Sequence, residues 1–187
     1  MVYASWRSLN KTDNMAQIKF KKLRAQNFRQ YASLNLDLPD RGCILIDGRN
    51  GHGKTTILEG IRFVISGKSM LDESSDNLIK NGEKECWYEI WMMMDSDPVI
   101  VRRARKRSGS ETVTVTRRGQ GKRVYSKTEA KEVLEDLFGL TAEVLMVSLI
   151  YTPSFRFFQA DRSEKMRVMR PILELDRYQS ARDLAAK

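Results

Sequence analysis

One short glycine-rich stretch restricts the fold of this chain more than any other feature. Residues 48–55 read Gly-Arg-Asn-Gly-His-Gly-Lys-Thr and match the pattern G-x-x-x-x-G-K-[ST] at every fixed position. A glycine-rich turn between two core elements would also suit this place. The lysine and threonine directly before a helical pattern favour a phosphate-binding loop, which requires a buried strand before the glycines and a helix after them.

The residue types of this loop suit the binding of a nucleoside triphosphate. Glycines let the backbone curl so that successive N–H groups point at one anion, and the helix that follows adds its positive N-terminal end. Lys54 can reach the β- and γ-phosphates, and the Thr55 hydroxyl can ligate Mg²⁺. The sequence therefore predicts ATP and Mg²⁺ as ligands, with Lys54 and Thr55 as the catalytic residues.

Strand and helix patterns surround the loop. Residues 17–28 and 33–39 predict two strands, the second with alternating leucines. The continuous apolar run at 42–47, GCILID, is typical of a strand buried on both faces. Apolar residues at helical spacing from 57 to 65 predict a helix, with Gly67 as its C-cap.

The middle of the chain predicts a β-meander followed by a helix. The segments 86–94, 98–103 and 112–118 read as strands joined by polar turns. Ser126 and Glu129 form a capping box for a helix that extends to Phe138 and is closed by Gly139.

Two polar residues near these elements have a functional and a structural reading. His52, the only histidine, lies at a variable loop position where the backbone amide matters more than the side chain. The run Ile90–Asp95 resembles the apolar strand and Asp that hold Mg²⁺ in such ATPases. Because Asp97, Pro98 and another strand follow, we interpret Asp95 as the turn of a hairpin.

Composition limits the class of protein. The 187 residues carry a net charge of +9, which suggests a polyanionic partner. Cys43 and Cys86, both in apolar segments, read as small core residues and not as a disulfide or zinc site. Since no apolar run approaches the length of a membrane span, we expect no membrane association and a cytoplasmic location, at the nucleoid of a bacterial or phage-infected cell.

Positive charge is concentrated in the meander. Ten Lys or Arg lie between positions 102 and 127, with Glu111 as the only acid. They are Arg102, Arg103, Arg105, Lys106, Arg107, Arg117, Arg118, Lys122, Arg123 and Lys127. A run of charge is usually a solvated face, but a clustered single-signed patch also attracts DNA phosphates. Few aromatics are interleaved here, so the pattern favours contacts to the DNA backbone over base stacking.

The order of motifs resembles a known family. The segments NFRQY, GRNGHGKTTILEGI, LIKNGEKECWYEIWM and PILELDRY follow one another as in SbcC-type proteins, SMC-like ATPases that partner a metal-dependent nuclease in double-strand-break processing. The YTP segment adds a likeness to the phage recombination-endonuclease ATPase subunits. The resemblance covers about residues 17–187.

The resemblance implies an α/β fold, the N-terminal lobe of a P-loop ATPase head of the ABC type. This lobe combines a mixed sheet, an antiparallel β-meander and the start of a coiled-coil helix. We expect an N-terminal extension at 1–15, the ATPase lobe at 16–175 and the root of the coiled coil at 176–187. A charged terminal helix packed on its own domain is the alternative for the last segment.

The resemblance also implies roles for particular residues. Arg29 would approach the nucleotide phosphates, and Lys80 would lie beside the nucleotide. The residues that would wrap the triphosphate are Asn50, Gly51, His52, Gly53, Lys54, Thr55 and Thr56. Thr152 stands where many relatives have the glutamine that senses Mg²⁺ and the γ-phosphate, which makes it a departure from the family pattern and a candidate metal-site residue. Gln159 lies too far along the chain to replace that glutamine.

An LSGGQ-like signature, an Asp-Glu strand and a late histidine are not found in the sequence. The resemblance therefore implies a C-terminal ATPase lobe, in the same protein or a separate chain, an ATP-mediated homodimer and a nuclease subunit that acts on DNA. Two alternatives stay open: a RecF- or SMC-type clamp ATPase without a nuclease, and a DNA-binding module with a non-hydrolysing nucleotide site.

Overall fold

The structure is a computed structural model that describes residues 17–69, 75–138, 161–163, 165, 166 and 169. Six strands and two α-helices make up the described part, with a short 3-10 turn at Ser75–Leu78. The strands are β1 Ile18–Phe28, β2 Tyr31–Asp37, β3 Glu85–Met94, β4 Asp97–Lys106, β5 Glu111–Arg117 and β6 Gly121–Ser126. The helices are α1 Lys54–Ser66 and α2 Lys127–Phe138.

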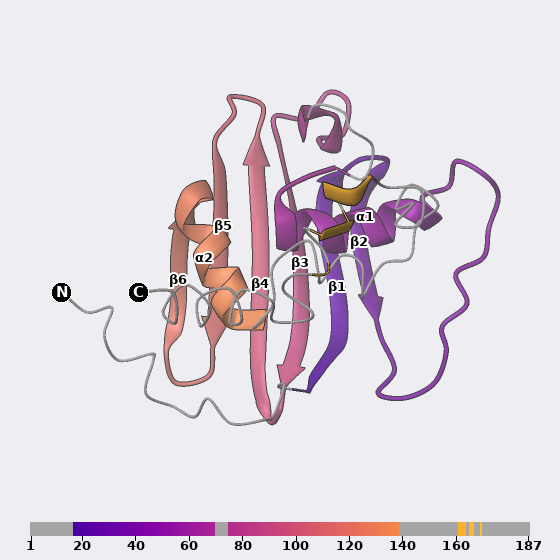
Figure 1. The fold of residues 1–187 in the computed structure, drawn as a ribbon. Coiled ribbons are helices and arrows are strands. Elements are labelled where there is room, and N and C mark those ends of the chain that lie inside the picture. Colours follow the sequence, from indigo (N-terminus) through magenta and orange to yellow (C-terminus); the bar gives the residue numbers. More distant parts are fainter. Residues whose placement is uncertain (1–16, 70–74, 139–160, 164, 167–168, 170–187) are drawn as a thin grey trace.

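The strands form one sheet in the order β2-β1-β3-β4-β5-β6 (Figure 1). Every pair of neighbours is antiparallel, so the predicted meander is confirmed, and the parallel pairing that a mixed sheet requires is not seen within the described residues. β6 was not predicted. Its sequence, GKRVYS, is polar and lies at an edge, where charged side chains are common because they hinder pairing of the open backbone with another strand.

Both helices lie on the same face of this sheet. The close approach of α1 depends on Gly60, because a Cβ at this position would overlap the ring of Tyr88 on β3. The Tyr88 hydroxyl also donates a hydrogen bond of 3.1 Å to the carbonyl oxygen of Ile57. Burial raises the pKa of Tyr88 above its usual range.

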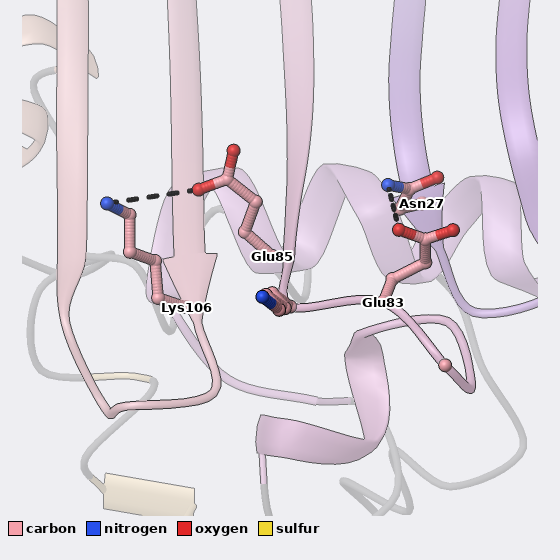
Figure 2. Close-up of a pocket in the computed structure, with 6 residues that line it drawn as sticks. Asn27, Glu83, Glu85 and Lys106 are labelled. Atoms are coloured by element: carbon pink, nitrogen blue, oxygen red, sulfur yellow. Dashed lines mark hydrogen bonds and ion pairs between the residues drawn. The ribbon is translucent and has the colours of Figure 1, made fainter.

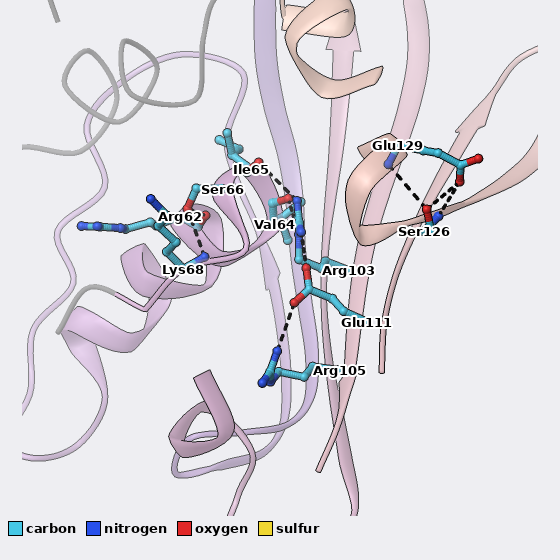
Figure 3. Close-up of polar contacts among 10 residues, drawn as sticks. All are labelled: Arg62, Val64, Ile65, Ser66, Lys68, Arg103, Arg105, Glu111, Ser126 and Glu129. Carbon is cyan, nitrogen blue, oxygen red and sulfur yellow. Dashed lines mark hydrogen bonds and ion pairs between the residues drawn. The ribbon is translucent and has the colours of Figure 1, made fainter. Parts of the chain in front are cut away.

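The C-cap of α1 and the capping box at the start of α2 are as predicted. Gly67 adopts a left-handed conformation with a φ of 71° and donates its N–H to the carbonyl oxygen of Phe63 at the end of α1. At the start of α2, the Glu129 carboxylate accepts hydrogen bonds from the N–H of Ser126 at 2.9 Å and from its hydroxyl at 2.8 Å (Figure 3). These bonds lower the pKa of Glu129.

The predicted strand at 42–47 is wrong. This segment forms no strand, and every residue from 39 to 52 is exposed. Ile44, Leu45 and Ile46 are 46%, 90% and 37% exposed. A strand buried on both faces needs partner strands, and none of the six described strands pairs with this segment. In Figure 1 the chain instead leaves β2 as a long loop and returns to α1.

The two cysteines have different environments. Cys86 on β3 is buried, as predicted, and burial raises the pKa of its thiol to about 12. Cys43 was predicted to be a core residue, but it is exposed because the segment that carries it does not join the sheet.

A buried network of charges joins β4 and β5 to the end of α1. Arg103 on β4 is only 3% exposed and forms an ion pair with Glu111 on β5. Its Nε donates to the carbonyl oxygen of Val64 at 2.9 Å, close to the end of α1 (Figure 3). Arg105 also contacts Glu111, at 3.3 Å, and pairs with Asp76 at 2.8 Å. Burial lowers the pKa of Arg103, and the Glu111 carboxylate opposes that shift.

Several predictions concern residues outside the described part. These are the extension at 1–15, the cap at Gly139, Thr152 and Gln159, and the coiled-coil root at 176–187. Residues 162, 163, 165, 166 and 169 are helical, as predicted for the segment that begins at Ser163. No helix in the described ranges is both long and apolar enough to span a membrane.

Replacement of Glu111 by Ala tests the energetic role of the buried network. We expect Glu111→Ala to lower the free energy of unfolding by about 3–5 kcal/mol, since it leaves a buried guanidinium without its counter-charge. The matched control is Glu85→Ala, because Glu85 pairs with Lys106 at the surface and its loss is expected to cost less than about 1 kcal/mol. Urea unfolding monitored by circular dichroism gives both values, and equal effects would contradict the network's role.

Candidate nucleotide-binding site

The start of α1 is a glycine in a conformation that other residues rarely adopt. Gly53 is the N-cap, with a φ of 96°, and α1 has no acidic residue in its first turn. A Cβ on Gly53 would lie 2.7 Å from the Tyr31 hydroxyl oxygen and still closer to the Gln30 amide. The glycine thus permits both the backbone turn and the contact with the β1–β2 hairpin, and no acidic side chain in the first turn of α1 offsets the positive end of the helix.

Lys54 contacts the loop that precedes it. Its ammonium lies 2.5 Å from the carbonyl oxygen of Gly48 and 3.0 Å from that of Arg49. The loop is closed further by a backbone hydrogen bond of 3.3 Å from His52 to Arg49. Carbonyl oxygens are neutral acceptors, and phosphate oxygens form stronger, charge-assisted hydrogen bonds with an ammonium. Lys54 is therefore placed to exchange these carbonyls for phosphate.

The tip of the β1–β2 hairpin joins the loop to a distant part of the chain. The Tyr31 hydroxyl donates to the Gly53 carbonyl oxygen at 3.2 Å, and the Thr56 hydroxyl donates to the Gln30 side-chain oxygen at 3.1 Å. Lys80 donates from its ammonium to the Gln30 carbonyl oxygen at 3.2 Å. The geometry thus brings Lys80, predicted to lie beside the nucleotide, to the hairpin that holds the start of α1.

Arg29 lies at the same hairpin but points to α1. Its guanidinium binds both carboxylate oxygens of Glu59, at 2.9 and 2.7 Å, and contacts the Ser69 hydroxyl at 3.1 Å. Ser69 donates to the same carboxylate at 2.7 Å. A carboxylate and a phosphate are alternative partners for the guanidinium fork. The role of Arg29 at the phosphates stays a prediction.

The remaining residues of the predicted loop are exposed, with the exception of Thr56. Asn50, Gly51 and His52 lie in the exposed segment before α1, and Thr55 is exposed in its first turn. Thr56 is buried against the hairpin. The exposed position of Thr55 suits a ligand of Mg²⁺, whereas Thr56 bonds the start of α1 to the β1–β2 hairpin.

These residues fit a magnesium-bound nucleoside triphosphate. An uncompensated helix N-terminus, a flexible ammonium and an exposed hydroxyl are the groups that a phosphate-binding loop requires. Lys54 and the loop amides would hold the phosphates and Thr55 would hold the metal ion. The bound triphosphate supplies a phosphoryl group, whose transfer depends on positioning and on charge around the γ-phosphate.

The predicted DNA-binding residues are not on one surface. Strand alternation sends Arg102 and Arg103 of β4 to opposite faces, and Arg103 lies in the core, away from any DNA. Arg105 is engaged by Asp76 and Glu111, and Arg107 donates to the Glu83 carbonyl oxygen at 2.7 Å. The exposed cations among those predicted are Lys106, Arg107, Arg118, Lys122, Arg123 and Lys127. Arg102 and Arg117 are half-buried.

A groove of about 520 Å³ lies beside the end of β1, the start of β3 and the end of β4, and no residue of the phosphate loop lines it. Asn27 donates to Glu83 at 3.1 Å on one side, and Lys106 pairs with Glu85 at 3.9 Å on the other (Figure 2). Because these polar groups satisfy one another, the groove presents no set of groups aimed at a reacting atom.

Two groups of residues, one beside the loop and one on β3, were not singled out from the sequence. Gln30 and Tyr31 support the loop, but nothing in their local pattern indicates it. Trp87 and Trp91, in contrast, could have been found, since β3 alternates Trp87, Glu89 and Trp91 with residues of the core. They lie on β3, directly beside the basic strand β4.

A family model for the AAA domain matches residues 22–187, which is most of the chain. The chain belongs to this AAA domain family.

The relatives of this AAA domain are proteins of DNA metabolism. It is 28% identical over 170 residues to exonuclease subunit 2 of Enterobacteria phage T4, covering 86% of this chain and 29% of that protein. It is 26% identical over 174 residues to the DNA double-strand break repair Rad50 ATPase of Methanopyrus kandleri, covering 88% of this chain and 20% of the relative. The predicted resemblance to SbcC-type ATPases is confirmed, and the chain spans less than a third of each relative.

Solved structures support the fold of this AAA domain. The RecF–ATP structure of the RecFOR pathway matches with a TM-score of 0.51 and 23% identity, over 61% of this chain and 30% of that one. The predicted fold class, the N-terminal lobe of a P-loop head, is confirmed. RecF of Shewanella loihica is 41% identical over 66 residues, 35% of this chain and 18% of the relative.

Gly53→Ala tests whether the hairpin tip holds the loop. We expect it to be more destabilising than Gly51→Ala, because both residues have a positive φ but only Gly53 is in contact with Gln30 and Tyr31. The excess should be about 1–3 kcal/mol in urea unfolding, typical of an overpacked contact, with weaker ATP binding in parallel. Tyr31→Ala should reduce the excess. Equal destabilisation by the two alanines would show that the contact has no energetic role.

Proposed function

We propose that this chain is the ATP-binding N-terminal lobe of an SMC-like DNA-repair ATPase. The observation that carries the proposal is the convergence at the start of α1. Gly53, Lys54 and the hairpin tip that contacts Lys80 meet there, in a chain of the AAA domain family. The named relatives, a phage exonuclease subunit and a double-strand break repair ATPase, support DNA processing as the setting.

The lobe binds ATP with Mg²⁺ through the phosphate loop. Lys54 moves from the carbonyl oxygens of Gly48 and Arg49 to the β- and γ-phosphates, and Thr55 ligates the metal ion. Loop amides from Asn50 to Gly53 surround the phosphates. Arg29 joins them only if its guanidinium exchanges the Glu59 carboxylate for phosphate.

Hydrolysis requires a C-terminal ATPase lobe, and the exposed apolar run at 44–46 is where it docks. A run that is this apolar and this exposed is expected to be covered by another surface. The C-terminal lobe, from the same protein or a separate chain, would supply the strands with which 42–47 pairs. The described residues provide the cradle, while phosphoryl transfer needs charge around the γ-phosphate from several elements.

On this proposal ATP joins two such heads into a homodimer, and the dimer regulates a metal-dependent nuclease on DNA. The exonuclease subunit relative supports the nuclease. A clamp ATPase without a nuclease is the second candidate, favoured by the likeness to RecF in fold and over short aligned stretches. Co-purification of the chain from its natural host distinguishes them, since only the first candidate brings down a nuclease subunit.

Lys54→Ala tests ATP binding. We expect the substitution to weaken binding of a non-hydrolysable ATP analogue about 10- to 100-fold, the loss of a charge-assisted hydrogen bond. Lys68→Ala is the matched control, because Lys68 is exposed just beyond the other end of α1. Isothermal titration calorimetry with Mg²⁺ measures both. Wild-type affinity in Lys54→Ala would contradict the proposed cradle.

Addition of the C-terminal lobe tests whether ATP hydrolysis requires both lobes. We expect the chain alone to bind ATP with negligible turnover, and the added lobe to raise phosphate release at least about a hundredfold. Leu45→Asp should prevent this gain without weakening ATP binding, because it buries a charge in the docking strand. The control is Val124→Asp, also an exposed apolar residue, on β6. Full turnover by the chain alone would contradict the proposal, and binding without any hydrolysis after lobe addition would favour a non-hydrolysing module.

A further inference from the structure

The face of the sheet opposite α1 and α2 carries two tryptophans. The alternation of β3 places Trp87, Glu89 and Trp91 on this face, while Tyr88 and Ile90 point into the core. Trp91 is 37% exposed. No helix within the described residues covers this side, which we call the open face. It includes Trp87, Glu89 and Trp91 on β3, Ile100 and Arg102 on β4, Lys22, Arg24 and Gln26 on β1, Asp37 on β2, Thr112, Thr114 and Thr116 on β5, and Lys122 and Val124 on β6.

Strand register places cations on both sides of these rings. Glu89 is opposite Arg24 of β1 and Arg102 of β4, so its carboxylate is flanked by two guanidiniums. Trp91 is opposite Lys22. The row of Trp91 continues through Ile100 and Thr116 to Lys122 at the far edge. The open face therefore combines aromatic surface with the cations Lys22, Arg24, Arg102 and Lys122 and with the central, largely buried Glu89. At its β2 edge Asp37 lies opposite Lys22 and pairs with it at 2.9 Å.

The central carboxylate holds the aromatic and basic groups in fixed positions. Glu89 accepts a hydrogen bond from the indole N–H of Trp91 at 2.5 Å and one from Nε of Arg102 at 2.7 Å. Arg24 lies 3.8 Å from the same carboxylate. The Arg102 guanidinium carbon is 4.0 Å from the ring centroid of Trp87, a cation–π pair. These groups are thus ordered before any ligand binds, which lowers the entropy lost on binding.

This combination suits a single-stranded nucleic acid better than a duplex. Every base of a single strand can offer its π-face to an aromatic ring, whereas a duplex keeps those faces inside its stack. Trp87 and Trp91 are four residues apart on one strand, about 13 Å, which leaves room for nucleotides between two stacking points. A planar guanidinium also stacks on bases. The surrounding cations attract the phosphates without regard to sequence.

We propose that the open face binds single-stranded DNA, with bases stacked on Trp91 and on the Trp87–Arg102 pair. Arg24 and Lys122 would contact the phosphates, and Lys22 would do so in exchange for its ion pair with Asp37. The basic run at 102–127 has few aromatics of its own, and β3, the strand paired with β4, supplies them. The inference rests on the proposed function only for the choice of DNA as the polyanion, since the surface lies on the opposite side of the sheet from α1 and its phosphate loop.

The test is the binding of fluorescein-labelled oligo(dT) of about 15 nucleotides to the full chain, followed by anisotropy. We expect Trp91→Ala to weaken binding at least about fivefold, the loss of one stacked base, and Trp91→Phe to weaken it less. Saturation with unlabelled oligo(dT) should quench tryptophan emission. Arg24→Glu should weaken binding and reduce its salt dependence. The control is Lys131→Glu on α2, which makes the same change of charge on the side of the sheet that the helices cover. It should leave the quenching of tryptophan emission by oligo(dT) intact.

Four results would overturn the inference. These are unchanged affinity in Trp91→Ala, no quenching at saturation, a duplex of equal length that binds more tightly, and a Trp91→Ala variant that alters self-association while DNA binding persists. The last would make the open face an interface between copies of the chain. ATP binding, measured in the same samples, separates the two proposals: Trp91→Ala should retain it, and loss of oligo(dT) binding with intact ATP binding concerns the open face alone.

Discussion

The contact between Gly60 of α1 and the ring of Tyr88 is the constraint on which the rest of the structure depends. Only a residue without a Cβ lets the helix come this close, and the tyrosine hydroxyl then bonds to the Ile57 carbonyl. The axis of α1 is fixed against the sheet by these two interactions. The phosphate loop ends at the N-terminus of this helix, so the direction of its positive end is set by packing several residues away.

Charged side chains have three separate roles in this molecule, and strand alternation divides the buried ion pair from the charges on the opposite face of the sheet. Arg103 and Glu111 lie in the core and join β4 and β5 to the end of α1. Lys54, at the other end of α1, is directed to its own loop. On the opposite side of the sheet, Glu89 orders Arg102 and its neighbours into a surface. Net charge alone therefore says little about which cations can meet a polyanion.

Much of the fold could be predicted because its signals are local. The capping box at Ser126, the alternation in β3 and the helical spacing after the glycines depend on neighbours in sequence. The wrong strand at 42–47 depends instead on partners, since an apolar run becomes a strand only beside another strand. Its composition does not reveal whether such a partner is present.

The candidate site could be predicted only in part, because only some of its residues belong to a local sequence motif. Lys54 and Thr55 stand in a motif whose spacing has a chemical meaning, so they could be named from the sequence. The support from Gln30 and Tyr31 is a contact across more than 20 residues, and it depends on how the β1–β2 hairpin meets α1. Arg103 looked like a surface cation because its neighbours are basic, and only its place on the strand buries it.

The position of the Lys54 ammonium tests the central claim most directly. A structure of the chain with a non-hydrolysable ATP analogue and Mg²⁺ should show the ammonium moved from the Gly48 and Arg49 carbonyl oxygens to the β- and γ-phosphates, with Gly53 still against Tyr31. If the analogue binds elsewhere, or if Lys54 keeps its carbonyl partners while the nucleotide is bound, the account of this loop as a triphosphate cradle is wrong.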